Sequence, residues 1–210
     1  LPAHPYPIDS CPATMQKPTP ELPDSPWMPA RVAARLASLL GDSDTYLEYG
    51  VGGSTLLAAR SGPGTLIGVE SDRRFLAAVG GAIERAGKNV IWHPVHVDLG
   101  PTTYLGYPKT LRVRGQWSDY ALAPWKLGLS PDLVLIDGRF RLACALATAA
   151  HAAPGTLVVF DDYATRPWYW RAARYLDLVE RVGRAVLLRV RATRAPRLDE
   201  AIKTAARYPL

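Results

Sequence analysis

The stretch from Asp44 to Asp72 restricts the fold of this chain more than any other part of the sequence. It reads DTYLEYGVGGSTLLAARSGPGTLIGVESD. An apolar, strand-like segment ends in Glu48, a glycine-rich turn follows, and small residues then suit a helix. A second apolar segment ends in another acid, Glu70. Continuously apolar strands that alternate with helices are typical of a parallel sheet covered on both faces.

The same alternation continues along the chain. Strands are expected at 45–50, 65–71, 89–98, 131–138, 156–163 and 184–192, the last pairing with residues near 179–182 as a hairpin. Helices are expected at 30–42, 54–62, 72–87, 141–155 and 166–179. The pattern fails from 100 to 130, where a long aromatic loop is predicted to be functional or a lid. The predicted fold class is α/β, a doubly wound and mostly parallel sheet with helices on both faces.

The N-terminal part of the chain has a different composition. Residues 1–29 contain nine prolines, which excludes a regular helix or a central strand there. We interpret 1–29 as an extended arm that lies on the surface or on a partner subunit of a homo-oligomer. The rest, 30–210, is predicted to be one domain.

Charge and hydropathy narrow the class of protein. The formal net charge is +6, and the excess is nearly all arginine in an alanine-rich chain. Because the charge forms no lysine-rich block or aromatic-interleaved patch, it does not favour a nucleic-acid partner. No apolar run approaches the roughly 18 residues of a membrane span, so no membrane association is expected. Without the charged-then-apolar order of a secretory signal, a cytoplasmic location is expected.

Acidic residues recur where the predicted strands end. In open α/β sheets, ligands bind beyond the carboxyl ends of the strands. Apolar or neutral residues would satisfy packing there, so the acids indicate a binding site. They are Glu48, Glu70, Asp98, Asp137, Asp161 and Asp162.

The glycine turn after the first strand can be compared with two kinds of ligand. Gly50 and Gly52 allow a tight turn and a close approach of ligand to backbone, and Gly53 adds freedom. A dinucleotide site would want glycine at position 55, which is Thr55, although Glu70 stands about where an acid holds a ribose. A carboxylate at Glu48 would also repel a pyrophosphate.

S-adenosylmethionine suits the turn better, because it carries an ammonium, a sulfonium, a carboxylate and a ribose but no phosphate. Glu48 can face the ammonium, and the helix N-terminus after Gly52 can accept the carboxylate. Glu70 can accept both ribose hydroxyls. Either Ser71 or Asp72 is expected to cap the helix that follows.

At these residues the chain resembles the class I S-adenosylmethionine-dependent methyltransferases. The resemblance rests on LEYGVGGST at 47–55, the acid of IGVE, DLVLIDGRFR and TLVVFDDY, and it covers roughly residues 30–190. It implies a Rossmann-like sheet of seven strands with one antiparallel strand in the last pair. It also implies roles for cofactor-binding residues. Glu48, Gly50, Gly52, Gly53 and Ser54 would form the methionine end, Glu70 with Ser71 the ribose site, and Asp98 the contact with the adenine amino group.

A second acidic cluster follows the fourth and fifth predicted strands. Adjacent strands lie about 5 Å apart, so Asp137, Asp161 and Asp162 are expected to converge and to need a compensating cation. A divalent ion such as Mg²⁺ would suit them. This is similar to the metal-dependent catechol-type O-methyltransferases, which have Asn where Asp162 stands and a catalytic lysine where this chain offers arginine.

Arginine cannot serve as a base, which leaves several roles open for this cluster. Arg139 and Arg141 can neutralise the acids as ion pairs. Asp162 can act as the general base, and Asp137 is a further catalytic candidate. Arg139 can instead bind a carboxylate or phosphate of the substrate.

Together these features predict a methyltransferase that uses S-adenosylmethionine and acts on a small-molecule acceptor, with O-methylation favoured. Two other functions fit parts of the sequence. One is a binding protein that keeps the methyltransferase fold without its activity, and the other is an NAD-dependent oxidoreductase.

Overall fold

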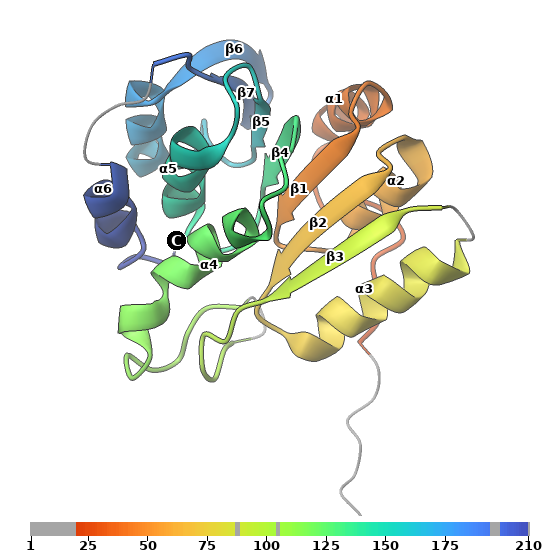
Figure 1. Cartoon of the computed structure of the whole chain (residues 1–210), viewed down its shortest axis with the longest axis horizontal. Coiled ribbons are helices and arrows are strands. Elements are labelled where there is room, and N and C mark those ends of the chain that lie inside the picture. Colours follow the sequence, from red (N-terminus) through yellow and green to blue (C-terminus); the bar gives the residue numbers. More distant parts are fainter. Residues whose placement is uncertain (1–19, 87–88, 104–105, 194–197, 210) are drawn as a thin grey trace, which may run out of the picture.

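The computed structural model describes residues 20–86, 89–103, 106–193 and 198–209. One seven-stranded sheet forms its centre, with the strand order β3-β2-β1-β4-β5-β7-β6 (Figure 1). The strands are β1 (Thr45–Tyr49), β2 (Thr65–Glu70), β3 (Ile91–His96), β4 (Leu133–Ile136), β5 (Leu157–Phe160), β6 (Leu176–Val182) and β7 (Ala185–Val190). The α-helices are α1 (Ala30–Gly41), α2 (Gly53–Ser61), α3 (Arg73–Arg85), α4 (Ser118–Leu122), α5 (Arg141–His151) and α6 (Leu198–Ala205). The 3₁₀ helices are η1 (Arg114–Gln116), η2 (Ala123–Leu127) and η3 (Pro167–Arg174).

The pairing of the strands confirms the predicted topology. β3, β2, β1, β4 and β5 are parallel, and β7 pairs antiparallel with both β5 and β6. The order reverses between β1 and β4, so the carboxyl ends of these two strands open a crevice at the switch point. No helix in the described part of the chain is long and apolar enough to cross a bilayer.

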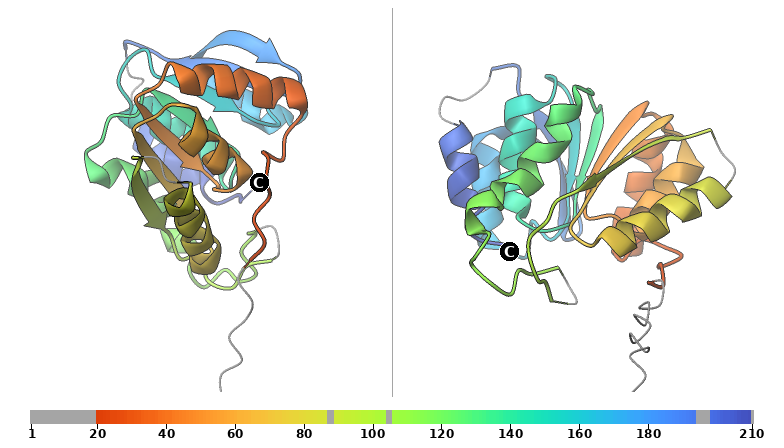
Figure 2. Two further views of the ribbon diagram at one scale, coloured as in Figure 1. Left: turned by 90° about the vertical axis from the view of Figure 1, so that its right-hand side faces the viewer. Right: turned by 60° about the horizontal axis from the view of Figure 1, so that its bottom comes forward.

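Helices cover both faces of the sheet (Figure 2). Alternate residues of each strand point to opposite faces. On β1, Leu47 and Tyr49 join the core beneath α4, α5 and α6, whereas Tyr46 joins the core beneath α1, α2 and α3. The central strands β1, β2, β4 and β5 are therefore buried on both faces, which explains their continuous apolar sequence.

Three parts of the sequence-based assignment differ from the structure. The predicted loop at 100–130 contains η1, α4 and η2, and Tyr120 and Ala121 of α4 are buried in the core. The predicted helix at 166–179 is wrong, because a 3₁₀ helix ends at Arg174 and β6 then begins at Leu176. β6 pairs with β7 from Leu176 to Val182, with one irregularity between Leu178 and Glu180, and this tertiary pairing decides its conformation. Helix α6 was not predicted, although Leu198 and Ile202 stand four residues apart and are both buried.

Residues 1–19 of the predicted proline-rich arm lie outside the described residues. The last part of the arm, 20–29, contains no helix or strand and packs on the domain. Leu22 and Met28 contact the core beneath α1 to α3. The carbonyl of Ser25 lies so close to Gly53 that a Cβ atom there would overlap it.

Candidate active site at the carboxyl end of the sheet

A cavity of about 510 Å³ lies at the carboxyl ends of the parallel strands. Such a volume is within the range of small-molecule sites, roughly 300–1,000 Å³. Its lining comes from the turns after β1, β2, β4 and β5 and from further residues at Trp27, Phe75, Thr102, Thr103, Gly106, Tyr107, Tyr120, Arg166 and Arg184. The polar and glycine residues of the lining include Gly50, Glu70, Ser71, Tyr107, Asp137, Gly138, Arg139, Arg141, Asp162, Arg166 and Arg184.

The floor of the cavity is a backbone contact between two glycine turns. Gly50 follows β1 with φ +89°, and a Cβ atom there would lie 2.6 Å from the Cα atom of Gly138. A Cβ atom on Gly138, which follows β4, would lie 2.8 Å from the amide nitrogen of Gly50. Neither position has room for a side chain, so the two turns meet backbone to backbone at the switch point, and neither glycine adds a side chain to the cavity. The sequence singled out Gly50 but not its partner.

Glu70, the acid predicted to bind a ribose, ends β2 and lines the cavity. Its Oε1 accepts hydrogen bonds from the Ser71 amide at 2.6 Å, the Ser71 hydroxyl at 3.1 Å and the Asp72 amide at 3.0 Å. Burial raises the pKa of Glu70, and these hydrogen bonds oppose the shift. Asp72 caps α3 through the amides of Arg74 and Phe75.

Glu48 does not lie where the sequence argument placed it. The side chain is fully buried on the α2 face of β1, where it accepts hydrogen bonds from the hydroxyls of Ser54 and Thr55. Burial raises its pKa to about 8. The carboxyl does not line the cavity, so its repulsion of a phosphate is no argument against a dinucleotide.

Four other predicted cofactor contacts, Gly52, Gly53, Ser54 and Asp98, also lie away from the cavity lining. The Gly52 amide donates to the Thr55 hydroxyl at 2.8 Å, and Gly53 lies under Ser25. Asp98 is exposed and accepts a hydrogen bond from the Gly100 amide at 2.8 Å, which closes its own turn. Of the predicted cofactor set, the cavity brings together Gly50, Glu70 and Ser71.

The three acids after β4 and β5 do converge, but arginines occupy their oxygens. Arg141 Nη2 lies 2.9 Å from Asp137, and Arg141 Nη1 lies 3.2 Å from Asp162. Arg184 binds both oxygens of the fully buried Asp161, at 2.6 and 2.9 Å. We call these three acids, with Arg141, Arg166 and Arg184, the acid–arginine network.

The network does not support the predicted divalent-cation site at Asp137, Asp161 and Asp162. Guanidinium groups already supply the compensating charge, and within the described residues no group of three or more acidic, His or Cys side chains is placed to hold a metal. Arg166 adds a further contact, with Nη2 at 3.1 Å from Asp162. Of the alternatives that the sequence left open, ion pairing is the one observed, and it uses Arg141.

Asp137 is the network acid whose environment suits proton transfer. Burial, together with the nearby charges of Asp161 and Asp162, raises its pKa to about 7, while Arg141 and Arg184 oppose the shift. Its side chain remains partly open to the cavity, with 22% of its surface exposed. A carboxyl with this pKa is about half ionised at neutral pH, as a general base requires.

Arg139 takes a different position from the other arginines of the cavity. Its guanidinium carbon lies 4.2 Å from the centroid of the Tyr107 ring. Its Nη1 atom is buried and has no hydrogen-bond partner among the described residues. A buried guanidinium donor without an acceptor costs free energy, so this atom marks a place where an acceptor on a ligand would bind.

The backbone directly after β4 and β5 is strained. Phe140 has φ +53° and Asp162 has φ +59°, in the left-handed region that costs non-glycine residues of order 1–3 kcal/mol. Such strain clusters at functional sites. In this structure it turns Asp162 toward Arg141, Arg166 and Arg184. Sequence reasoning did not single out Arg166 or Arg184. Arg166 stands four residues after Asp162, and Arg184 lies in the turn before β7, which the sheet order places beside β5.

Comparisons with known proteins agree with this fold. No family model matches the chain, and no curated protein matches it in sequence. A methyltransferase-like protein from Silicibacter pomeroyi matches it with a TM-score of 0.80 and 30% identity, over 89% of this chain and 98% of that chain. An O-methyltransferase from Bacillus cereus in complex with SAH matches with a TM-score of 0.54 and 17% identity, over 81% and 84%. A methyltransferase from Geobacter sulfurreducens matches with a TM-score of 0.53 and 14% identity, over 79% and 82%.

The chain therefore belongs to the class I S-adenosylmethionine-dependent methyltransferases, the class that its sheet order and strand-end cavity define. Within that class, its similarity to the Silicibacter pomeroyi protein extends over nearly the whole length of both chains. The likeness to the Bacillus cereus and Geobacter sulfurreducens enzymes shows the shared fold alone.

Proposed function

We propose that the protein transfers the methyl group of S-adenosylmethionine to a small-molecule acceptor, most readily an oxygen nucleophile. One observation carries the proposal: Glu70 stands at the cavity end of β2, beside the closed glycine contact of Gly50 and Gly138. A carboxylate there can accept both hydroxyls of a ribose. The structurally similar Bacillus cereus O-methyltransferase is in complex with SAH, the demethylated product of S-adenosylmethionine, which supports the choice of donor.

The cavity also contains groups that suit an acceptor. S-adenosylmethionine supplies an already activated methyl group, so the protein mainly has to align the acceptor and take up its proton. Positioning of this kind can contribute about 7–11 kcal/mol. Asp137 would accept the proton of an acceptor hydroxyl, and Arg141 would hold the Asp137 carboxylate in place. Arg139, with its unpaired Nη1, would bind a carboxylate or phosphate of the acceptor.

Binding of the donor is tested by thermal shift with SAH, S-adenosylmethionine and NAD. We expect SAH to raise the melting temperature, with a stabilisation of about 2.7 kcal/mol at 100 times its Kd. Glu70→Gln should weaken SAH binding about 10- to 100-fold, because hydrogen bonds to a charged group contribute roughly 1.5–3 kcal/mol. Glu84→Gln, on the exposed side of α3, is the matched control and should bind as the wild type does. A rise in melting temperature with NAD but not with SAH or S-adenosylmethionine would contradict the proposal and favour an NAD-dependent oxidoreductase.

Turnover is tested by SAH release over a panel of hydroxyl, carboxyl and amine acceptors. Because the pKa of Asp137 is about 7, we expect the rate to rise as the pH passes through about 7 and the carboxylate forms. Asp137→Asn should lower kcat about 10²- to 10⁴-fold while SAH still binds. SAH binding without turnover on any acceptor would favour a binding protein that lacks methyltransferase activity. A rate that does not change with pH would show that Asp137 is not the general base.

A further inference from the structure

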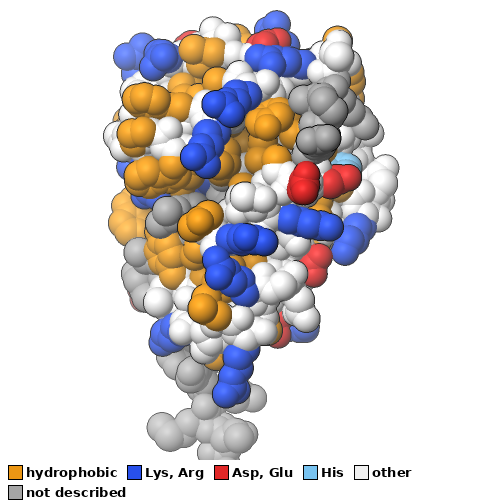
Figure 3. All heavy atoms as spheres, turned by 90° about the vertical axis from the view of Figure 1, so that its left-hand side faces the viewer, with side chains coloured by type: hydrophobic (Ala, Val, Ile, Leu, Met, Phe, Trp, Pro, Cys, Tyr) orange, Lys and Arg blue, Asp and Glu red, His pale blue; other side chains and the backbone are white. Residues whose placement is uncertain are grey.

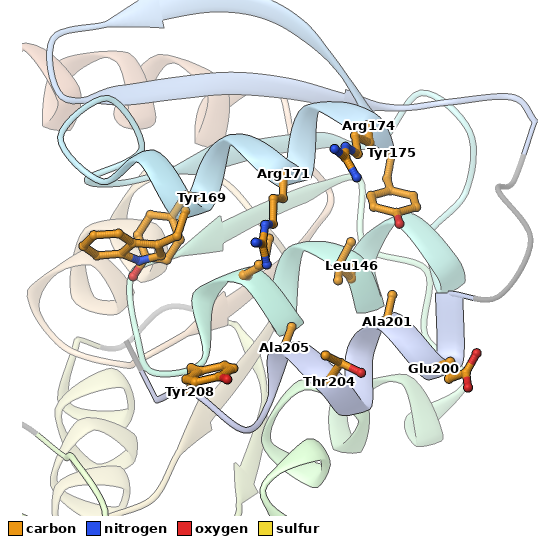
Figure 4. Close-up of a pocket in the computed structure, with 12 residues that line it drawn as sticks. Leu146, Tyr169, Arg171, Arg174, Tyr175, Glu200, Ala201, Thr204, Ala205 and Tyr208 are labelled. Atoms are coloured by element: carbon orange, nitrogen blue, oxygen red, sulfur yellow. The ribbon is translucent and has the colours of Figure 1, made fainter.

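A second concave surface lies on the side of the molecule, away from the strand ends. It is a groove of about 750 Å³ between η3, α5 and α6, which we call the lateral groove (Figure 4). Its lining is Leu142, Leu146, Trp168, Tyr169, Arg171, Arg174, Tyr175, Glu200, Ala201, Thr204, Ala205 and Tyr208. None of these residues lines the active-site cavity.

The floor of the lateral groove is apolar and its ends are aromatic. Leu142 and Leu146 are four residues apart on α5, and Ala201 and Ala205 are four apart on α6, so each pair shares one helix face. The small alanines leave the groove open. Trp168 and Tyr208 are 44% and 62% exposed. Figure 3 shows that hydrophobic side chains with lysine and arginine between them cover much of this side of the molecule.

The 3₁₀ helix η3 contributes two positively charged side chains to the groove, Arg171 and Arg174. A 3₁₀ helix has three residues per turn, so Trp168, Arg171 and Arg174 lie on the same face. Figure 4 shows Arg171 directed from η3 toward α5. In the described part of the chain, neither the Arg171 nor the Arg174 guanidinium has an ion pair or a hydrogen bond, unlike Arg166 and Arg191 nearby.

The charge of the lining is therefore uncompensated. It holds two arginines and one acid, Glu200, which comes from α6 at the opposite end of the groove from Tyr208 (Figure 4). An apolar ligand without charge would cover the two guanidiniums and leave them without a partner, which is costly. An anion without an apolar part would leave the floor and Trp168 in water.

We propose that the lateral groove binds a small anionic ligand with an apolar or aromatic body. The anionic group lies on Arg171 and Arg174, and the body covers Leu146, Ala201 and Ala205. The volume of the groove is within the range of small-molecule sites. Carboxylates and sulfonates share this chemistry, with two guanidiniums as donors.

The lateral groove and the active-site cavity are neighbours, because Tyr169 of the groove contacts Arg166 of the cavity. Tyr169 lines the groove, and its hydroxyl accepts a hydrogen bond from Arg166 Nη1 at 3.3 Å. Arg166 in turn pairs with Asp162 in the cavity. The ligand of the groove is therefore distinct from the donor and acceptor of the proposed reaction, although it contacts a residue that touches the acid–arginine network.

The test uses the fluorescence of 8-anilino-1-naphthalenesulfonate, an anionic aromatic probe, on the folded protein. We expect saturable binding that decanoate displaces at least 10-fold better than decanol, and that excess SAH does not displace. Arg171→Gln combined with Arg174→Gln should weaken probe binding at least 10-fold. The control pair Arg85→Gln and Arg189→Gln removes the same charge from exposed positions elsewhere and should change binding less than 2-fold.

A second variant keeps the test independent of those arginines. Ala201→Phe fills the groove and should abolish probe binding while the thermal transition stays cooperative, since loosely folded states also bind this probe. Equal binding by the double variant and its control would overturn the proposal, as would equal competition by decanol and decanoate. Displacement by SAH would place the probe in the active-site cavity. Displacement by a single-stranded 12-mer oligonucleotide but not by decanoate would replace the small ligand with a nucleic acid.

Discussion

Replacing Arg141 by methionine is expected to lower the free energy of unfolding by about 3–5 kcal/mol at pH 7. Arg141 is 5% exposed and bonds to Asp137, Asp162 and the carbonyl oxygens of Gly138 and Asp161. Methionine fills similar space but leaves buried carboxylates without their main counter-charge. Urea denaturation at several pH values measures the loss.

The same experiment includes a control variant, and the loss of stability is expected to depend on pH in one direction. Arg35→Met removes an ion pair with Glu180 whose side chains are 36% and 41% exposed, so it should cost no more than about 1 kcal/mol. Without Arg141, the pKa of Asp137 in the folded state rises further above its unfolded value. Relative to the wild type, the folded variant then holds an extra proton at and above about pH 7, so the deficit of Arg141→Met should grow as the pH rises through 7 and level off below about pH 6. A loss as small as that of Arg35→Met would show that the network tolerates unpaired acids.

Glu48→Gln is expected to change how stability depends on pH. The pKa of Glu48 is about 8 in the folded protein and near 4.5 when exposed, because burial disfavours the carboxylate. The folded state therefore holds one more proton than the unfolded state between these values. The contribution of Glu48 is fully present below about pH 4.5 and is lost as the pH rises toward 8, by up to about 1.4 kcal/mol per pH unit.

Glutamine at position 48 cannot ionise, so that slope should disappear. We expect the unfolding free energy of Glu48→Gln to gain on the wild type at each step from pH 5 to pH 8, as measured by urea denaturation. Glu84→Gln changes an exposed acid and should give a curve parallel to the wild type. Parallel curves for Glu48→Gln as well would mean that Glu48 is ionised in the folded protein.

Sequence reasoning located the candidate site but not the direction of each side chain in it. Apolar strands that end in acids predicted the sheet, the crevice and the convergence of Asp137 with Asp161 and Asp162. Glu48 was misplaced because a strand-end acid can point into the crevice or along a face. The two-residue period puts Glu48 on the same face as Tyr46, toward α2, so the strand pattern itself contained the answer.

The partners of the acids were harder to predict. Arg139 and Arg141 are two residues apart, and only the start of α5 at Arg141 decides which of them bends back to Asp137. Arg184 reaches Asp161 because β7 lies beside β5 in the sheet, a contact that depends on the complete topology. The structure does not support the metal prediction because arginines balance the acids. Arg141 and Arg166 stand four residues after Asp137 and Asp162, and Arg184 is brought to Asp161 by the sheet.

The proline-rich segment before α1 has a practical consequence. Trp27 lines the cavity, and its carbonyl oxygen accepts a hydrogen bond from Arg184 Nη2 at 3.4 Å. A shortened protein that starts at the first helix would thus lose Trp27 from the cavity lining and one hydrogen-bond acceptor of Arg184. Trimming or proteolysis ahead of residue 30 would therefore change the cavity at the strand ends as well as shorten the chain.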